Sequence, residues 1–210
     1  MRPQALLLDL DGTLVDSEPI HRRGYRAFFA HRGWDVPDLS LFTGRRAEDV
    51  FATEAGPWSG LDPVALHAEV LPFVPLDPPT PVPGARDLLL AARAAAVPVA
   101  IVTSAGPDWV ERSLVEGLGV TDVVDLVVTA EDVVDGKPDP SGYALAVERL
   151  SVEASEVVAV EDSPAGVRAA LGAGVRRVVA VHTTHAAALL SRAGAAEVHA
   201  DLRPLRDLLA

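Results

Sequence analysis

Near the N-terminus, a short apolar run passes directly into two carboxylates and a turn: Leu6-Leu7-Leu8-Asp9-Leu10-Asp11-Gly12-Thr13. Similar apolar runs return at 99–102, 126–128, 157–160 and 178–181. Because these runs are continuous and do not alternate with polar residues, they are typical of strands buried on both faces of a parallel sheet. Helical patterns stand between them, at 84–96, 108–118, 142–150 and 164–173. Strands that alternate with helices predict a doubly wound α/β fold.

The alternation is interrupted between the first two apolar runs. Residues 16–76 contain no buried-strand pattern, but they include a helical pattern at 18–32. A proline-dense stretch at 72–83 leads back to the apolar runs. A stretch so rich in proline makes a stiff connector. We therefore expect a core domain at 1–15 and 82–210, with an inserted, mostly helical domain at 16–81, which we call the cap.

The composition excludes several classes of protein. The chain of 210 residues contains no cysteine, which excludes disulfides, thiol catalysis and zinc–thiolate sites. A net charge of −12 argues against a nucleic-acid partner, because phosphate backbones need basic residues. The N-terminal apolar run is too short for a signal peptide, and no run approaches the ~18 apolar residues of a membrane span. We expect a monomeric cytoplasmic protein without a membrane partner.

Polar residues follow the apolar runs at the end where ligands bind. In an open α/β sheet, ligands lie beyond the carboxyl ends of the strands. After the first four runs, in chain order, come Asp9, Asp11, Gly12 and Thr13, then Thr103 and Ser104, then Lys137, and then Glu161 and Asp162. Acids, hydroxyls and a lysine are therefore expected to meet at one edge of the sheet.

Asp9 and Asp11 point to phosphate chemistry with a metal. Residues i and i+2 of an extended chain point the same way, so both carboxylates can face one site. Their mutual repulsion favours a cation, and Mg²⁺ prefers one or two carboxylates together with phosphate oxygens. Asp9 can then act as nucleophile and Asp11 as general acid and base, with Gly12 and Thr13 near the phosphate. A simple polar turn would use the same residue types.

Lys137 is the one lysine among the 18 basic residues, so 17 are arginines. An ammonium is not interchangeable with a guanidinium, so we predict that Lys137 offsets the charges of Asp9 and of a bound phosphate. Thr103 and Ser104 would grip a phosphate oxygen, although a threonine at a strand end is ordinary.

Glu161 and Asp162 are candidates for the metal site, with Asp162 as ligand and Glu161 in the outer shell. Acids are also favoured in the first turn of a helix by its dipole, which leaves a second interpretation open. In the cap, His21, Arg45 and Arg46 are candidates for substrate binding, and a solvated role is open for each. No partner can be named for His67, His182 or His185.

The chain resembles the haloacid dehalogenase superfamily in motifs that follow the family's order and spacing: Asp9-Leu10-Asp11-Gly12-Thr13, Thr103, Lys137-Pro138 and Glu161-Asp162-Ser163. The resemblance covers essentially the whole chain. It implies a Rossmann-like core, a helical cap inserted after the first motif, and an aspartyl-phosphate intermediate. It also implies these roles: Asp9 as nucleophile, Asp11 as acid and base, Thr103 and Lys137 as phosphate-binding residues, and Asp9, Asp162 and the Asp11 carbonyl as Mg²⁺ ligands.

Within the superfamily, the chain looks most like small sugar-phosphate and glycerol-phosphate phosphatases, through residues 102–104, 129–133, 136–138 and 44–46. β-Phosphoglucomutase is a less close resemblance. His21 and Ser17 fit the mutase, but its cap lysine is missing here. We therefore expect a Mg²⁺-dependent phosphatase that acts on a small phosphorylated metabolite, a sugar or polyol phosphate. The alternatives are a mutase-like phosphotransferase and a non-catalytic phosphate-binding module.

Overall fold

The computed structural model describes residues 2–209. Its main sheet has six strands, in the order β5 (Leu126–Val128), β4 (Val99–Val102), β1 (Leu6–Leu8), β6 (Val158–Glu161), β7 (Arg177–Val181) and β8 (Glu197–His199). All neighbouring strands are parallel, and Leu7 of β1 lies opposite Ala100 on one side and Ala159 on the other. The sequence prediction of a parallel α/β sheet is confirmed.

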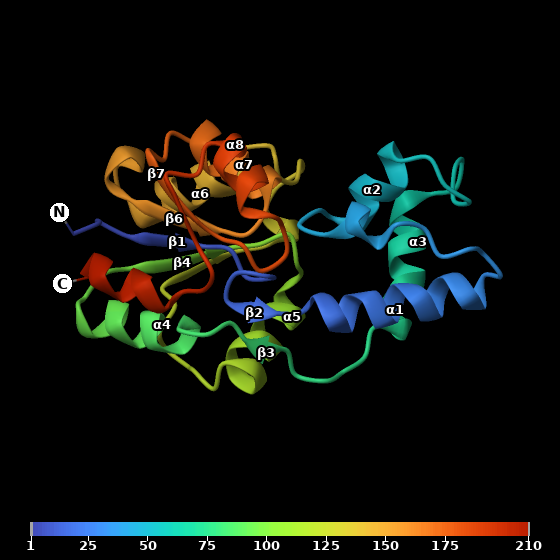
Figure 1. The fold of residues 1–210 in the computed structure, drawn as a ribbon, viewed down its shortest axis with the longest axis horizontal. Coiled ribbons are helices and arrows are strands. Elements are labelled where there is room, and N and C mark those ends of the chain that lie inside the picture. The colour runs from blue at the N-terminus through green and yellow to red at the C-terminus, as the bar shows by residue number, and fades with distance from the viewer. Residues whose placement is uncertain (1, 210) are drawn as a thin grey trace.

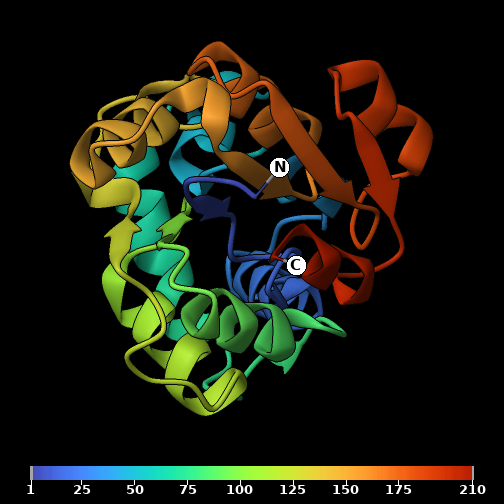
Figure 2. The ribbon, with the colours of Figure 1, turned by 90° about the vertical axis from the view of Figure 1, so that its left-hand side faces the viewer.

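Helices cover both faces of this sheet, because its central strands are apolar on both sides. Leu6 and Leu8 pack into one buried cluster, whereas Leu7 between them packs into another. The first cluster is covered by α4 (Ala85–Ala94), α5 (Pro107–Arg112) and the 3-10 helix η6 (Arg203–Leu209), and the second by α6 (Ser141–Leu150), α7 (Pro164–Gly172) and α8 (Ala187–Ala193). The resulting three layers are visible in Figures 1 and 2.

Two elements differ from the sequence prediction. β8 was not predicted, because its sequence contains no apolar run. It is a short edge strand that includes the half-buried polar residues Glu197 and His199. The helix expected over 108–118 is α-helical only as far as Arg112, and Ser113–Gly117 forms a wider π-helical turn.

The cap is a helical insertion with a core of its own. It consists of α1 (Glu18–His31), η1 (Leu39–Phe42), α2 (Ala47–Thr53), α3 (Pro63–Val70) and η2 (Leu71–Phe73), packed around Phe28, Phe29 and Trp58. A two-stranded antiparallel ribbon of β2 (Val15–Asp16) and β3 (Thr80–Pro81) joins it to the sheet domain. We keep 16–81 as our proposal for its bounds. Within residues 2–209, no helix is long and apolar enough to cross a membrane.

β1 marks the point where the chain reverses its direction across the sheet. β4 and β5 follow on one side of β1, and β6, β7 and β8 on the other. Such a reversal leaves a crevice at the carboxyl ends of the strands. In Figure 1 the cap helices α1, α2 and α3 lie beyond this edge, at the right of the sheet. The fold therefore places a ligand crevice between sheet and cap.

Candidate active site

A cavity of about 660 Å³ lies between the carboxyl edge of the sheet and the cap. The expected site residues that line it are Asp9, Asp11, Gly12, His21, Arg45, Arg46, Thr103, Ser104, Lys137 and Asp162. Two others, Thr13 and Glu161, are fully buried and lie outside the described cavity wall. The fold thus brings residues that are far apart in sequence to one cavity.

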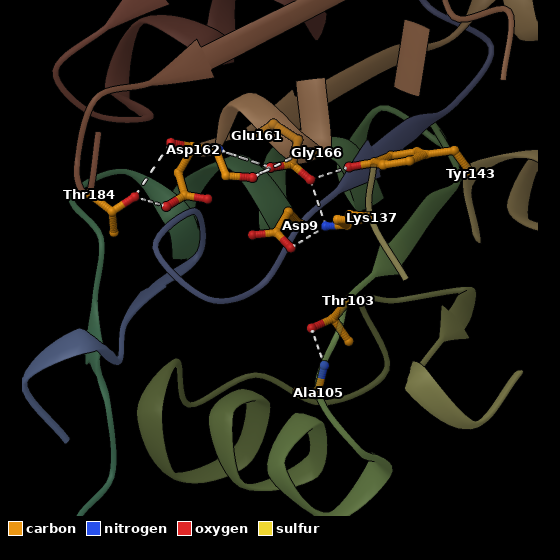
Figure 3. Close-up of polar contacts among 10 residues, drawn as sticks. Asp9, Thr103, Ala105, Lys137, Tyr143, Glu161, Asp162, Gly166 and Thr184 are labelled. Carbon is orange, nitrogen blue, oxygen red and sulfur yellow. Dashed lines mark hydrogen bonds and ion pairs between the residues drawn. The ribbon is translucent and has the colours of Figure 1, made fainter. Parts of the chain in front are cut away.

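Lys137 forms a buried ion pair with two carboxylates. Its Nζ lies 2.5 Å from Oδ1 of Asp9 and 2.6 Å from Oε1 of Glu161, and its side chain is 8% exposed. Figure 3 shows the ammonium between these carboxylates. Burial lowers the pKa of Lys137, but the charges of Asp9 and Glu161 outweigh it and raise the pKa above its ordinary value. Lys137 is therefore held in its charged form beside Asp9.

Both oxygens of Glu161 are occupied by protein donors. Oε1 accepts hydrogen bonds from Lys137 and, at 2.8 Å, from the Tyr143 hydroxyl, while Oε2 accepts one from the Ser163 hydroxyl at 3.2 Å. Gly166 leaves room for this packing, since a Cβ there would stand 1.9 Å from a Glu161 oxygen. These contacts favour Glu161 as a support for Lys137 over a role as direct metal ligand.

The carboxylates at this edge form a donor set that suits a hard cation. Oxygens of Asp9, Glu161 and Asp162 lie within 4.8 Å of one another in buried positions. Burial, opposed by Lys137, raises the pKa of Asp9 to about 7, and burial together with the Asp9 charge raises the pKa of Asp162 well above its ordinary value. A divalent cation would neutralise this crowding, so the oxygen ligands fit Mg²⁺.

Two threonines after β7 fix the neighbourhood of Asp162. The Thr184 hydroxyl donates to Oδ2 of Asp162, as drawn in Figure 3, and the Thr183 hydroxyl donates to the carbonyl of Gly12. Gly12 has a left-handed backbone with φ of 80°, and a Cβ there would stand 2.1 Å from Oδ2 of Asp162. A glycine is therefore required at this close approach.

Asp11 is held by donors from both domains. Nε1 of Trp109 donates to its Oδ1 at 2.9 Å, and Nε2 of His21 lies 3.6 Å from the same oxygen. Burial raises the pKa of Asp11, but His21, Ser17 and Trp109 outweigh it and lower the pKa below its ordinary value. In turn, burial lowers the pKa of His21, and Asp11 and Glu18 together raise it above its ordinary value. The pair therefore favours a carboxylate beside an imidazolium.

Thr103 lies directly after β4 and lines the cavity. Its Oγ1 accepts the backbone N–H of Ala105 at 3.0 Å, which closes a tight turn (Figure 3). The half-buried Ser104 lines the cavity as well. Thr13 is different, because its buried hydroxyl has no hydrogen-bond partner among residues 2–209.

Arg45 and Arg46 line the cavity, but protein acceptors engage both. Nη1 of Arg45 lies 2.6 Å from Oε1 of Glu54 within the cap. Arg46 is buried and reaches across to the core, where it donates to the carbonyl oxygens of Val133 at 3.2 Å and Val134 at 3.0 Å. The structure therefore distinguishes two arginines that the sequence treated alike.

Several residues of the site gave no signal in the sequence. Trp109 and Tyr143 look like ordinary apolar positions of α5 and α6, and Thr184 lies in a loop after β7. His67 is no longer without a partner, since its Nδ1 lies 2.7 Å from Oε1 of Glu48. The one available hint was the place of Thr184, just beyond the carboxyl end of a strand.

Comparison with known proteins agrees with this geometry. Residues 3–174 match the family described as haloacid dehalogenase-like hydrolase. The chain is 40% identical over 192 residues to validoxylamine A 7′-phosphate phosphatase of Streptomyces hygroscopicus subsp. limoneus. This match covers 89% of each of the two chains. The chain is also 36% identical over 186 residues to hexitol phosphatase A of Escherichia coli (strain K12), in a match that covers 87% of this chain and 84% of the relative.

A solved structure shares the whole architecture. It is the crystal structure of CbbY from Rhodobacter sphaeroides in complex with phosphate, with a TM-score of 0.81 and 29% sequence identity over 97% of this chain and 96% of that one. The similarity in fold covers both the sheet domain and the inserted helices. The chain belongs to the haloacid dehalogenase-like hydrolases and is an enzyme of their phosphatase type.

Proposed function

We propose that this enzyme hydrolyses the phosphate monoester of a sugar or polyol, with Mg²⁺ as cofactor and Asp9 as nucleophile. One observation carries the proposal, and it concerns the carboxylate of Asp9. Its Oδ1 contacts the Lys137 ammonium, and the carboxylate also belongs to the acidic cluster that includes Asp162. The names of the relatives support the substrate class, since one is a hexitol phosphatase and the other a phosphatase of validoxylamine A 7′-phosphate.

In the first step, an oxygen of Asp9 attacks phosphorus and the bond from phosphorus to the leaving oxygen breaks. Asp11 is a carboxylate in the free enzyme; it takes up a proton from solvent as the anionic phosphate binds beside it, and gives that proton to the leaving oxygen, so the leaving group departs as a neutral alcohol. Asp9 becomes an acyl phosphate. Lys137 offsets the negative charge that gathers around Asp9, and the hydroxyls and backbone of Thr103 and Ser104 hold the phosphate oxygens.

In the second step, Asp11 takes a proton from water, and the resulting hydroxide attacks the phosphorus of the acyl phosphate. The bond from phosphorus to Asp9 breaks, inorganic phosphate leaves, and both aspartates return to their starting states. Asp9, Asp162 and the Asp11 carbonyl would hold Mg²⁺, which when bound supplies Lewis acidity at the phosphate.

The cap side of the cavity suits a leaving group rich in hydroxyls. Glu18, Tyr25, Glu48 and His67 line it, and they offer carboxylate, phenol and imidazole groups. Glu18 already accepts hydrogen bonds from Thr43 at 2.9 Å and from Arg22 at 2.5 Å, which neutralises that arginine. Polyhydroxy compounds with a single phosphate match this surface better than compounds with a second phosphate.

A panel of phosphorylated metabolites tests the proposal. Release of inorganic phosphate is measured for hexose, hexitol and glycerol monophosphates and for validoxylamine A 7′-phosphate, with Mg²⁺ and with EDTA. Activity that depends on Mg²⁺ and is highest for a sugar or polyol monophosphate is expected. Full activity after exhaustive chelation, or no activity on any monoester including p-nitrophenyl phosphate, would contradict it.

A mutase-like phosphotransferase is the second candidate, and the environment of Asp11 favours it. His21 lies 3.6 Å from Asp11, and Ser17 is the second residue that fits the mutase pattern. In such an enzyme, a sugar hydroxyl would take the phosphoryl group from Asp9 in place of water. The engaged arginines of the cap argue for the phosphatase, because they leave a second phosphate without an evident anchor.

A further inference from the structure

We propose that Trp109 is a positioning residue, which holds Asp11 by its Oδ1 and thereby leaves Oδ2 as the oxygen that exchanges the proton. This inference rests on the proposed function, because it assigns a task within the transfer of the phosphoryl group to Asp9. Trp109 lies on α5, 98 residues from Asp11 in sequence, and has no place in the sequence motifs of the site.

The evidence is the convergence of two donors on a single oxygen. Nε1 of Trp109 donates to Oδ1 of Asp11 at 2.9 Å, and His21 approaches this same oxygen at 3.6 Å. Ser17 also acts on Asp11 and helps to lower its pKa, but among residues 2–209 the side-chain hydrogen bond of ordinary length and angle that Asp11 accepts comes from Trp109 and ends on Oδ1. A general acid needs one oxygen free to carry and release its proton. The two donors therefore divide the carboxyl group into an anchored side and an exchanging side.

The indole ring is itself well supported. One part of Trp109 packs against the buried cluster beneath α5, and its ring lies 5.0 Å from the His21 imidazole at an interplanar angle of 57°. His21 belongs to the cap and Trp109 to the core, so the two rings meet only where the domains face each other. A rigid ring of this kind fixes the position of its N–H more closely than a flexible side chain would.

The task can be isolated through the leaving group. When the bond from phosphorus to the leaving oxygen breaks, a poor leaving group needs the proton of Asp11, whereas p-nitrophenolate departs as a stable anion without it. Phenyl phosphate and p-nitrophenyl phosphate have nearly the same shape and differ mainly in this need. The ratio kcat/KM reports the steps up to departure of the leaving group, before hydrolysis of the acyl phosphate.

The test is Trp109→Phe, which keeps an aromatic ring and removes the N–H. We expect kcat/KM to fall about tenfold or more for phenyl phosphate and for the best polyol phosphate, but less than about threefold for p-nitrophenyl phosphate. Trp34→Phe is the matched control, since Trp34 packs in the cap and lies outside the described cavity wall. It should not change the ratio between the two aryl substrates.

A second measurement uses Asp11→Asn, which removes the proton that Trp109 is proposed to direct. In that background Trp109→Phe should no longer discriminate between phenyl and p-nitrophenyl phosphate, because coupled residues are not additive. Two results would overturn the inference: equal losses on phenyl and p-nitrophenyl phosphate, or the same discrimination in the wild-type and Asp11→Asn backgrounds. Trp109 would then line the cavity without positioning Asp11. A wild-type enzyme inactive on every monoester would instead contradict the proposed phosphatase function.

Discussion

The ammonium nitrogen of Lys137 lies 2.5 Å from Oδ1 of Asp9, and the same nitrogen is 2.6 Å from Oε1 of Glu161. One cation therefore serves two buried carboxylates, and the ring of Tyr143 lies 5.4 Å below it. A planar guanidinium is larger than an ammonium and directs its donors differently. This packing gives a physical reason for a lysine in a chain whose other basic residues are arginines.

Lys137→Arg is expected to lower kcat/KM on the order of a hundredfold, although the charge is retained, because displacement of Asp9 by about 1 Å is enough for such a loss. Steady-state kinetics with p-nitrophenyl phosphate measures it. Arg206→Lys, an exchange at an exposed position, is the control and should leave kcat/KM unchanged. Wild-type kinetics for Lys137→Arg would show that charge alone is needed.

Asp9→Asn is expected to abolish turnover in a folded protein. An amide cannot form the acyl phosphate, so kcat should fall by more than about a thousandfold. Phosphate release measures the loss, and circular dichroism checks that the fold is retained. If the variant kept a tenth of the wild-type kcat, the nucleophile would have to be another group or a water molecule.

Asp9→Asn should also stabilise the protein when metal is removed. Burial raises the pKa of Asp9 from 3.8 to about 7. As pH rises between these values, the unfolded chain gives up a proton that the folded chain keeps, so the free energy of unfolding falls. In EDTA, the Tm of the variant should therefore exceed that of the wild type by several degrees at pH 8 and by less at pH 5. Added Mg²⁺ should raise the Tm of the wild type more than that of the variant. A lower Tm for the variant at pH 8 in EDTA would contradict the raised pKa.

The sequence was sufficient for the parts of the molecule that rest on local patterns. The continuous apolar runs predicted the buried strands β1 and β4. The candidate catalytic residues Asp9 and Asp11 could be predicted because they directly follow β1 in the sequence. The contacts of Trp109 and Tyr143 could not be predicted, because an aromatic residue on a helix is an ordinary core residue unless its polar atom is known to find a partner. Long-range packing decides that, and it leaves no periodic trace in the sequence.

Arg46 is expected to matter more than Arg45, since it ties the cap to the core through two carbonyl oxygens. Arg46→Gln should raise KM and lower kcat for a polyol phosphate, because cap closure positions the substrate. Arg45→Gln, whose ion pair with Glu54 stays within the cap, should have a smaller effect. The measurement is kcat and KM for both variants on the same substrate. A larger loss for Arg45→Gln would indicate that its ion pair opens to bind the substrate.

The last prediction separates a phosphatase from a mutase. A mutase must shield its acyl phosphate from water until a sugar hydroxyl arrives, and it must hold a bisphosphate by the end that does not react. Here the cap carries no lysine, and the cap arginines that line the cavity, Arg22, Arg45 and Arg46, are engaged by Glu18, Glu54 and the core carbonyls. Arg112, on the core side of the cavity, lies 5.9 Å from the Trp109 ring, and of the arginines that line the cavity it is the best candidate to anchor a second phosphate.

We therefore expect ³¹P NMR of each sugar phosphate, incubated with enzyme and Mg²⁺, to show growing inorganic phosphate and no isomer. β-Glucose 1-phosphate and glucose 6-phosphate should not interconvert even when a bisphosphate is added. A growing isomer peak without free phosphate would establish a mutase, and its loss in Arg112→Gln would identify the anchor.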